Sequence, residues 1–135
     1  MIRQILEDGQ KGINRAAGIG FNEVILMLSN TVTTAEVYLM FDDLRFSDKG
    51  DVVTFMDPNG THLHMNMENV KEVKLIHRMN EQGLPSYAVW FQDENDEPVL
   101  RIYLRKSEQD ETNQPRHELF MLMIEKYGNS IKIGG

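Results

Sequence analysis

A tight-turn signal at the centre of the chain constrains the fold more than any other feature. Asp57-Pro58-Asn59-Gly60 separates a strand-like run, residues 51–56, from a second run, residues 61–67. Proline presets φ at one turn position, and Asn-Gly readily adopts the positive φ of a tight hairpin. In the second run apolar residues alternate with polar ones: Leu63, Met65 and Met67 against His62, His64 and Asn66. The sequence therefore predicts an antiparallel hairpin with two different faces.

Short apolar runs elsewhere predict more strands, at residues 24–28, 37–41, 70–77, 86–92 and 99–104. Residues 1–10 favour one or two helical turns, residues 106–114 a loop, and residues 131–135 an edge strand or a tail. A helix is predicted over residues 116–127, with Pro115 at its start and Gly128 after its end. This order indicates an α+β fold in one domain, 1–135, with hairpin-connected antiparallel β-sheets packed against terminal helices.

Charge and composition exclude several classes of partner. The 135 residues carry 14 Lys and Arg against 21 Asp and Glu, for a net charge of −7. This balance argues against nucleic acid and against an anionic membrane as partners. The chain has no cysteine, which excludes disulfides and thiolate metal sites and suits a cytoplasmic location. The acidic residues near the N-terminus do not match a signal peptide.

Two histidines and three arginines are the candidate ligand-binding residues. His62 and His64 are expected on the same strand face, roughly 7 Å apart, where they either ligate one metal or are ordinary surface histidines. Arg78, Arg101 and Arg105 either clamp the carboxylates of an anionic ligand or are solvated edge cations. No arrangement typical of nucleophilic or acid–base catalysis is present. His117, which opens the predicted terminal helix, is expected to face solvent.

Residues 57–70, residues 73–78 and the hairpin of residues 86–104 resemble the intracellular haem-utilisation proteins. These are the ChuX/HutX group and the related half-repeats of HemS-like haem-degrading proteins. The resemblance implies their α+β fold, haem as the bound cofactor and a homodimer. His64 stands where the family has a histidine in the strand before a Glu-Asn pair, and Arg78 matches a basic residue after the next strand.

The resemblance assigns His64 as the predicted ligand of the haem iron, with His62 as its substitute, and Arg78 and Arg101 as the propionate-binding candidates. We expect a cytoplasmic, non-catalytic protein for haem trafficking, buffering or iron utilisation. Two alternatives stay open. One is a haem-degrading enzyme. The other is a dimeric interaction module without haem, because residues 29–34 lack the upstream histidine of the family.

Overall fold

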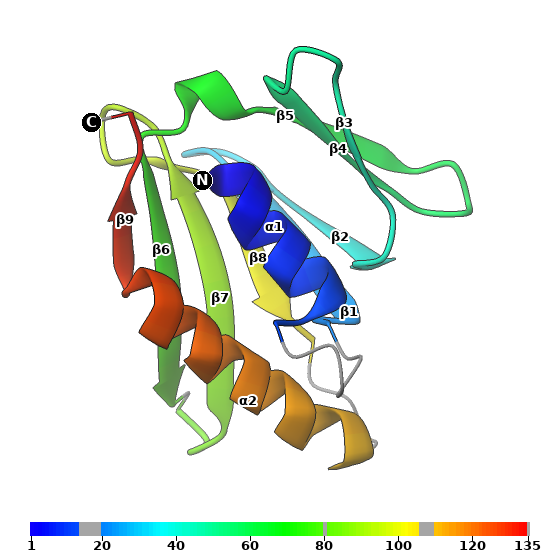
Figure 1. Cartoon of the computed structure of the whole chain (residues 1–135), viewed down its shortest axis with the longest axis vertical. Helices are drawn as coiled ribbons and strands as arrows, with labels where there is room; N and C mark the ends of the chain where they lie inside the picture. Colours follow the sequence, from blue (N-terminus) through cyan, green and yellow to red (C-terminus); the bar gives the residue numbers. More distant parts are fainter. Residues whose placement is uncertain (14–19, 80, 106–109, 135) are drawn as a thin grey trace.

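A six-stranded antiparallel sheet is the centre of the computed structural model, which describes residues 1–13, 20–79, 81–105 and 110–134 (Figure 1). The strand order is β2-β1-β8-β7-β6-β9. These strands are β1 Glu23–Ser29, β2 Thr34–Met40, β6 Glu72–Met79, β7 Pro85–Gln92, β8 Pro98–Leu104 and β9 Ser130–Lys132. Three pairs of neighbouring strands are also consecutive in sequence: β1 with β2, β6 with β7, and β7 with β8. Strand β1 also pairs with β8, which is distant in sequence.

A second, three-stranded sheet is formed by the predicted central hairpin and one further strand. Its order is β3-β4-β5, with β3 Leu44–Phe46, β4 Val52–Met56 and β5 His62–Asn66. The turn is closed by the Gly60 amide, which donates to the Asp57 carbonyl, and Gly60 has a φ of 91°. A short 3₁₀ turn, η1 Met67–Asn69, then leads into β6.

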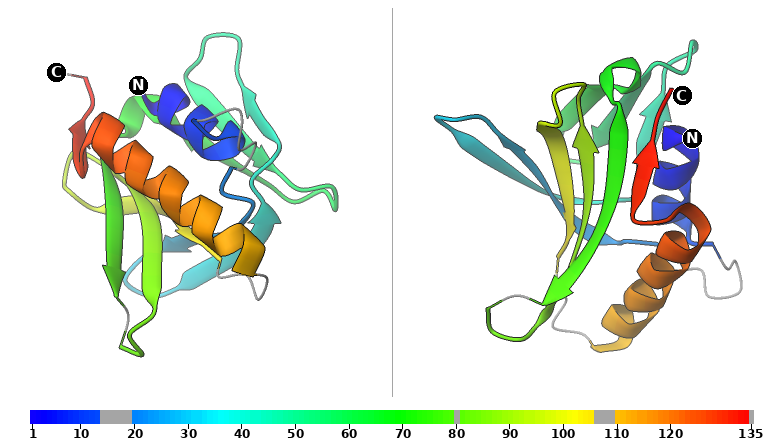
Figure 2. Two further views of the ribbon diagram at one scale, coloured as in Figure 1. Left: turned by 60° about the horizontal axis from the view of Figure 1, so that its bottom comes forward. Right: turned by 90° about the vertical axis from the view of Figure 1, so that its left-hand side faces the viewer.

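Both helices lie on the same side of the large sheet (Figure 2, right). They are α1 Ile2–Lys11 and α2 Asp110–Tyr127. The buried residues of α1, which are Ile2, Ile5, Leu6 and Gly9, follow the spacing of one helical stripe. Helix α1 is anchored to α2 by Asp8, whose carboxylate accepts hydrogen bonds from the Lys126 ammonium at 2.8 Å and the Tyr127 hydroxyl at 2.5 Å.

A row of buried aromatic rings joins the two sheets and the helices. Ring centroids are 5.9 Å apart between Phe41 and Phe55, 5.5 Å between Phe21 and Phe41, and 6.3 Å between Phe21 and Phe120. All four rings are at most 2% exposed. The row runs from β4 of the small sheet, past the end of β2 and the start of β1, to α2, so the small sheet packs into the same core as the helices.

The other face of the large sheet is not covered by any helix of the described residues (Figure 2, right). Strand register gives its members, which we call the open face: Ile25, Met27, Glu36, Tyr38, Met40, Lys74, Ile76, Arg78, Ala88, Trp90, Arg101 and Tyr103. Side chains one position away, such as Leu75, Val89 and Ile102, point into the core and are at most 1% exposed.

The α+β fold with antiparallel sheets is confirmed, and three local predictions were wrong. Helix α2 begins at Asp110 and includes Pro115, although residues 106–114 were predicted to be a loop; residues 106–109 lie outside the described residues. Pro115 has no N–H, so α2 lacks one intrahelical hydrogen bond near its start. The remaining turns of the helix keep the proline in helical conformation. Helix α1 extends further than its glycines suggested, and β3 was not predicted.

Candidate functional site

His62 and His64 lie on one exposed face of the small sheet, as the alternation predicted. Their ring centroids are 5.8 Å apart. In the register of the sheet His64 lies opposite Thr54 of β4, and Nδ1 of His64 is 2.8 Å from the Thr54 hydroxyl oxygen. A hydrogen bond at Nδ1 fixes the ring orientation and leaves Nε2 as the nitrogen for a ligand. When Nδ1–H is the donor, Nε2 carries the free lone pair that iron requires.

Arg78 and Arg101 both lie on the open face, next to Trp90, the only tryptophan of the sequence. Trp90 is the cross-strand partner of Arg101, and the Arg101 guanidinium is 4.6 Å from its ring centroid. The Arg78 guanidinium lies on the same ring at 5.7 Å. Cation–π contact holds both charges over an apolar surface. A similar contact joins Arg105 to Tyr38 of β2 at 5.1 Å.

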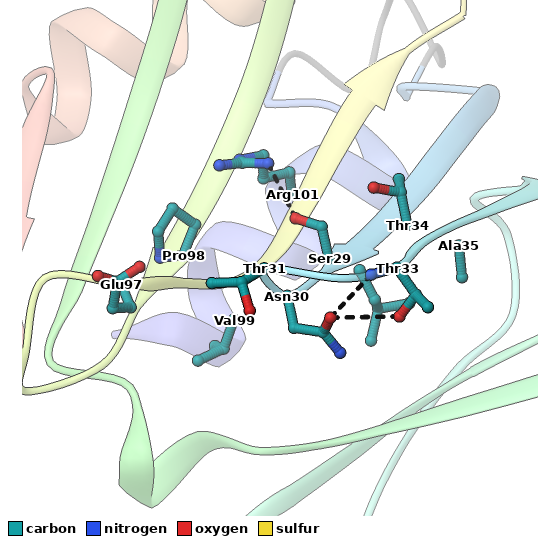
Figure 3. A pocket seen from close by; sticks show the side chains of 11 residues that line it. Ser29, Asn30, Thr31, Thr33, Thr34, Ala35, Glu97, Pro98, Val99 and Arg101 are labelled. Carbon is teal, nitrogen blue, oxygen red and sulfur yellow. Dashed lines mark hydrogen bonds between the residues drawn. The ribbon is translucent and has the colours of Figure 1, made fainter.

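Arg101 lines a large cavity between the β1–β2 hairpin and the start of β8 (Figure 3). Its volume is about 820 Å³. Figure 3 shows the Arg101 guanidinium beside the Ser29 hydroxyl, to which it donates at 3.4 Å. The rest of the lining is mainly threonine, small apolar side chains and one carboxylate, Glu97. The cavity lining therefore contains one cationic side chain, Arg101, and one anionic side chain, Glu97.

A second cavity, of about 340 Å³, brings His64 to the same region of the molecule. It is lined by residues of β5 and η1 and by Leu28 and Val99, and those last two residues also line the Arg101 cavity. The two cavities thus adjoin, with a histidine on one and an arginine on the other. Each falls within the range of small-molecule and cofactor sites, about 300–1,000 Å³.

Not all the predicted ligand residues meet at this place. Arg78 lines a different cavity of about 180 Å³ on the open face, together with Trp90 and Tyr103. The structure therefore divides the predicted residues into two groups. His64 and Arg101 line the adjoining cavities, and Arg78 joins Arg101 only through Trp90.

Two buried donors in this region, Trp90 Nε1 and Arg101 Nε, have no hydrogen-bond partner among the described residues. Nearly all buried polar atoms in folded proteins are paired, so these two can accommodate a further group. Because both are donors, they suit an anionic ligand better than a cationic one.

A second polar cluster was missed from the sequence. His117 is not solvent-facing as predicted: its Nδ1 is 2.5 Å from the Tyr87 hydroxyl, beneath α2. The adjacent Arg116 is 4% exposed. Burial lowers the pKa of Arg116 and raises the pKa of Tyr87. The sequence prediction placed Arg116 and His117 at the open end of the helix, whereas α2 begins at Asp110 and both lie within it.

Within the described residues, no group of three or more His, Asp or Glu side chains is placed to hold a metal ion. Among the helices of the described residues, none is long and apolar enough to span a bilayer.

Solved structures with the same fold include several proteins of low sequence identity. A protein from Erwinia carotovora has a TM-score of 0.70 and 14% identity, over 93% of this chain and 70% of its own. ChuX, called a heme binding protein in a second structure, has a TM-score of 0.67 and 14% identity, over 92% of this chain and 72% of its own. ChuS, a heme degrading enzyme from Escherichia coli O157:H7, has a TM-score of 0.66 and 13% identity, over 90% of this chain.

This chain spans only 33% of the ChuS chain. No curated protein matches its sequence. A protein-family model, described only as "-like", matches residues 19–129, which is most of the chain. The fold is the one shared by ChuX and ChuS. The chain belongs to the ChuX/HemS-like family.

Proposed function

We propose that this protein binds haem in the cytoplasm and carries or buffers it without transforming it. The observation that supports this most is the meeting of His64 and Arg101 on two adjoining cavities that share Leu28 and Val99. A haem site needs an iron ligand, an apolar surface for the ring and a cation for the propionates. These cavities offer all three within one region.

Each residue has a distinct role in this proposal. His64 supplies Nε2 to the iron, and Thr54 orients the imidazole through Nδ1. His62, whose ring centroid is 5.8 Å away, is the substitute ligand when His64 is removed. Arg101 binds a propionate, since its side chain lines the larger cavity. Arg78 holds a second propionate from the far side of Trp90.

The direct test is a titration of haemin into the purified apo-protein, followed in the Soret region. The proposal expects a saturable Soret band at micromolar protein and one haem per chain. A spectrum that equals free haemin at every ratio contradicts it and favours the alternative of an interaction module without haem.

The same complex distinguishes carriage from degradation. With ascorbate and catalase present, a carrier keeps its Soret band, apart from the change caused by iron reduction. A steady loss of the band with release of iron would instead assign the protein to haem degradation, the activity named for ChuS.

We further propose that two copies associate through the open face. This face carries exposed apolar side chains, with Tyr38 at 54% and Met40 at 41%, and charges of both signs. A self-complementary contact between two copies needs such a composition.

Sedimentation equilibrium tests this association. The wild type is expected at twice the chain mass of 15.6 kDa. Tyr38→Asp should yield the monomer, because it buries a charge in the contact. Val32→Asp is the matched control, since Val32 is 87% exposed in the β1–β2 turn, outside the open face. A monomeric wild type, or a dimer that Tyr38→Asp leaves intact, contradicts the proposal.

A further inference from the structure

A polar pocket lies beneath α2, on the opposite side of the large sheet from Trp90. Tyr87 and Trp90 lie on the same strand, but Tyr87 occupies the core-facing parity. The pocket has a volume of about 150 Å³ and is lined by Pro85, Tyr87, Leu104, Asn113 and Arg116. Because one water occupies about 30 Å³ of liquid, it has room for about five water-sized groups. It is therefore too small for haem.

The Tyr87 hydroxyl is held in place by a network of rings. It is 2.5 Å from Nδ1 of His117. The Tyr87 ring stacks on His77 of β6, with centroids 4.8 Å apart and planes 4° apart, and it also contacts Phe120 at 5.3 Å. Two strands and a helix thus fix one hydroxyl group on the wall of the pocket.

Arg116 brings a buried positive charge to the same pocket. The side chain is 4% exposed. Its Nη1 donates to the backbone carbonyls of Phe21 at 3.1 Å and Glu23 at 3.3 Å, and its Nη2 donates to the Asn113 amide oxygen at 2.8 Å. Nε is buried without a hydrogen-bond partner.

Among the described residues, no carboxylate lies within ion-pair distance of the Arg116 guanidinium. Burial lowers the pKa of Arg116, and the more distant charge of Glu23 raises it only in part. Isolated buried charges are costly, and structures usually supply them with a counter-charge.

We propose that this pocket binds a small oxyanion, a carboxylate or a phosphate, between the Arg116 guanidinium and the Tyr87 hydroxyl. The anion adds a counter-charge to Arg116, for which the described part of the chain provides no ion-pair partner. Burial raises the pKa of Tyr87, so its phenol stays protonated at neutral pH. With Nδ1–H of His117 as the donor in the His117–Tyr87 hydrogen bond, the Tyr87 hydroxyl keeps its own proton for the anion. Pro85 and Leu104 form an apolar wall that limits the ligand to a small one. The site is separate from the one proposed for haem.

Titrations of the apo-protein with acetate and with inorganic phosphate, at ionic strength held constant with chloride, test this site. Nitrogen–proton correlation spectra should show saturable shifts at residues 86–87, 113–114 and 116–117, and the Tm should rise with anion concentration, because a ligand of the folded state stabilises it. A response to acetate alone identifies a carboxylate site, a response to phosphate alone a phosphate site, and a response to both a general oxyanion site.

Two variants and one control locate the binding. Tyr87→Phe keeps the ring packing and should weaken anion binding about tenfold. Arg116→Lys keeps the charge and should weaken anion binding by a similar factor. Tyr103→Phe removes a hydroxyl from the open face and should bind as the wild type does.

The absence of saturable shifts with either anion overturns the proposal, as does binding that Tyr87→Phe leaves unchanged. Should Arg116→Lys fail to fold, because Arg116 also ties α2 to the chain entering β1, the comparison of Tyr87→Phe with Tyr103→Phe still decides the question.

Discussion

Arg101 lies between the Trp90 ring and the larger cavity, and both determine which ligand its guanidinium can bind. Its guanidinium is 4.6 Å from the centroid of Trp90, and its Nη1 reaches Ser29 at the cavity wall. The ring fixes the side chain in place, so little rotamer entropy is lost when an anion binds. An arginine positioned in this way is suited to a carboxylate ligand.

Arg101→Gln should weaken haem binding about tenfold, since a charge-assisted hydrogen bond contributes about 1.5–3 kcal/mol. The matched variant Glu97→Gln removes the opposite charge from the same cavity and should leave the affinity equal or higher. Soret titrations give both dissociation constants. Equal weakening by the two variants would mean that cavity structure, rather than charge, controls binding.

The shared strand face of His62 and His64 was predictable from the sequence, and the surroundings of these residues were not. Strand alternation placed His62 and His64 on one face, because this face is decided locally by the period of two. Their distance from Arg101 was not predictable, since it depends on how β5 packs near β1 and β8. His117 was misplaced for the same reason: its orientation depends on where α2 begins.

The docking of α1 depends on a close approach that only glycine permits. A Cβ on Gly9 would lie 2.5 Å from Cε2 of the Phe21 ring. Phe21 is 1% exposed and belongs to the row of aromatic rings that joins the sheets. The glycine that weakened the helix prediction is therefore required for the packing of that helix.

Gly9→Ala should destabilise the fold by about 1–3 kcal/mol, as overpacking does in other cores, despite the better helix propensity of alanine. Urea denaturation measures the free energy of unfolding. Lys11→Ala, an exposed change in the same helix, should stay within about 0.5 kcal/mol of the wild type. A stabilised Gly9→Ala would show that α1 does not pack on Phe21.

The edge strand β9 is tied to β6 by a carboxylate that titrates. Glu72 is 6% exposed and accepts from the Lys132 ammonium and the Ser130 hydroxyl, each at 2.7 Å. The hydrogen bond to Lys132 is the main cause that lowers the pKa of Glu72, followed by the bond to Ser130. A group with a lowered folded-state pKa stabilises the fold above its unfolded-state pKa, and loses that effect as the pH falls through the folded-state value.

Thermal unfolding between pH 7 and pH 3 should therefore show a loss of Tm in the wild type that begins below about pH 4.5, the ordinary value for glutamate. Glu72→Gln should show a smaller loss over that interval. Lys132→Met removes the main cause of the pKa shift and should also reduce the loss. Parallel curves for the wild type and Glu72→Gln would exclude Glu72 as a source of acid sensitivity.

At the scale of elements, local sequence signals were sufficient to predict the positions of most strands, but they did not predict which strands pair with each other. The turns at residues 57–60 and 93–97 identified two hairpins, because proline, asparagine and glycine signals act within a few residues. The pairing of β1 with β8 and the edge position of β9 join distant parts of the chain. The sequence alone carries no periodic signal for such pairings.

The molecule as a whole combines an acidic net charge with a locally cationic sheet face. The net charge is −7, yet Lys74, Arg78 and Arg101 gather on the open face, with Arg105 beside them. Charges beyond about 8–10 Å are screened at physiological salt, so these local cations, rather than the net charge, govern the approach of a haem propionate.

Haemin titrations of the wild type, His64→Ala and His62→Ala, compared by Soret position and by electron paramagnetic resonance of the ferric complex, test the central claim most directly. We expect the wild type and His62→Ala to give the same histidine-ligated spectrum. His64→Ala should give a shifted Soret band and weaker binding. A His64→Ala spectrum and affinity identical to those of the wild type would contradict the assignment of His64 as the iron ligand.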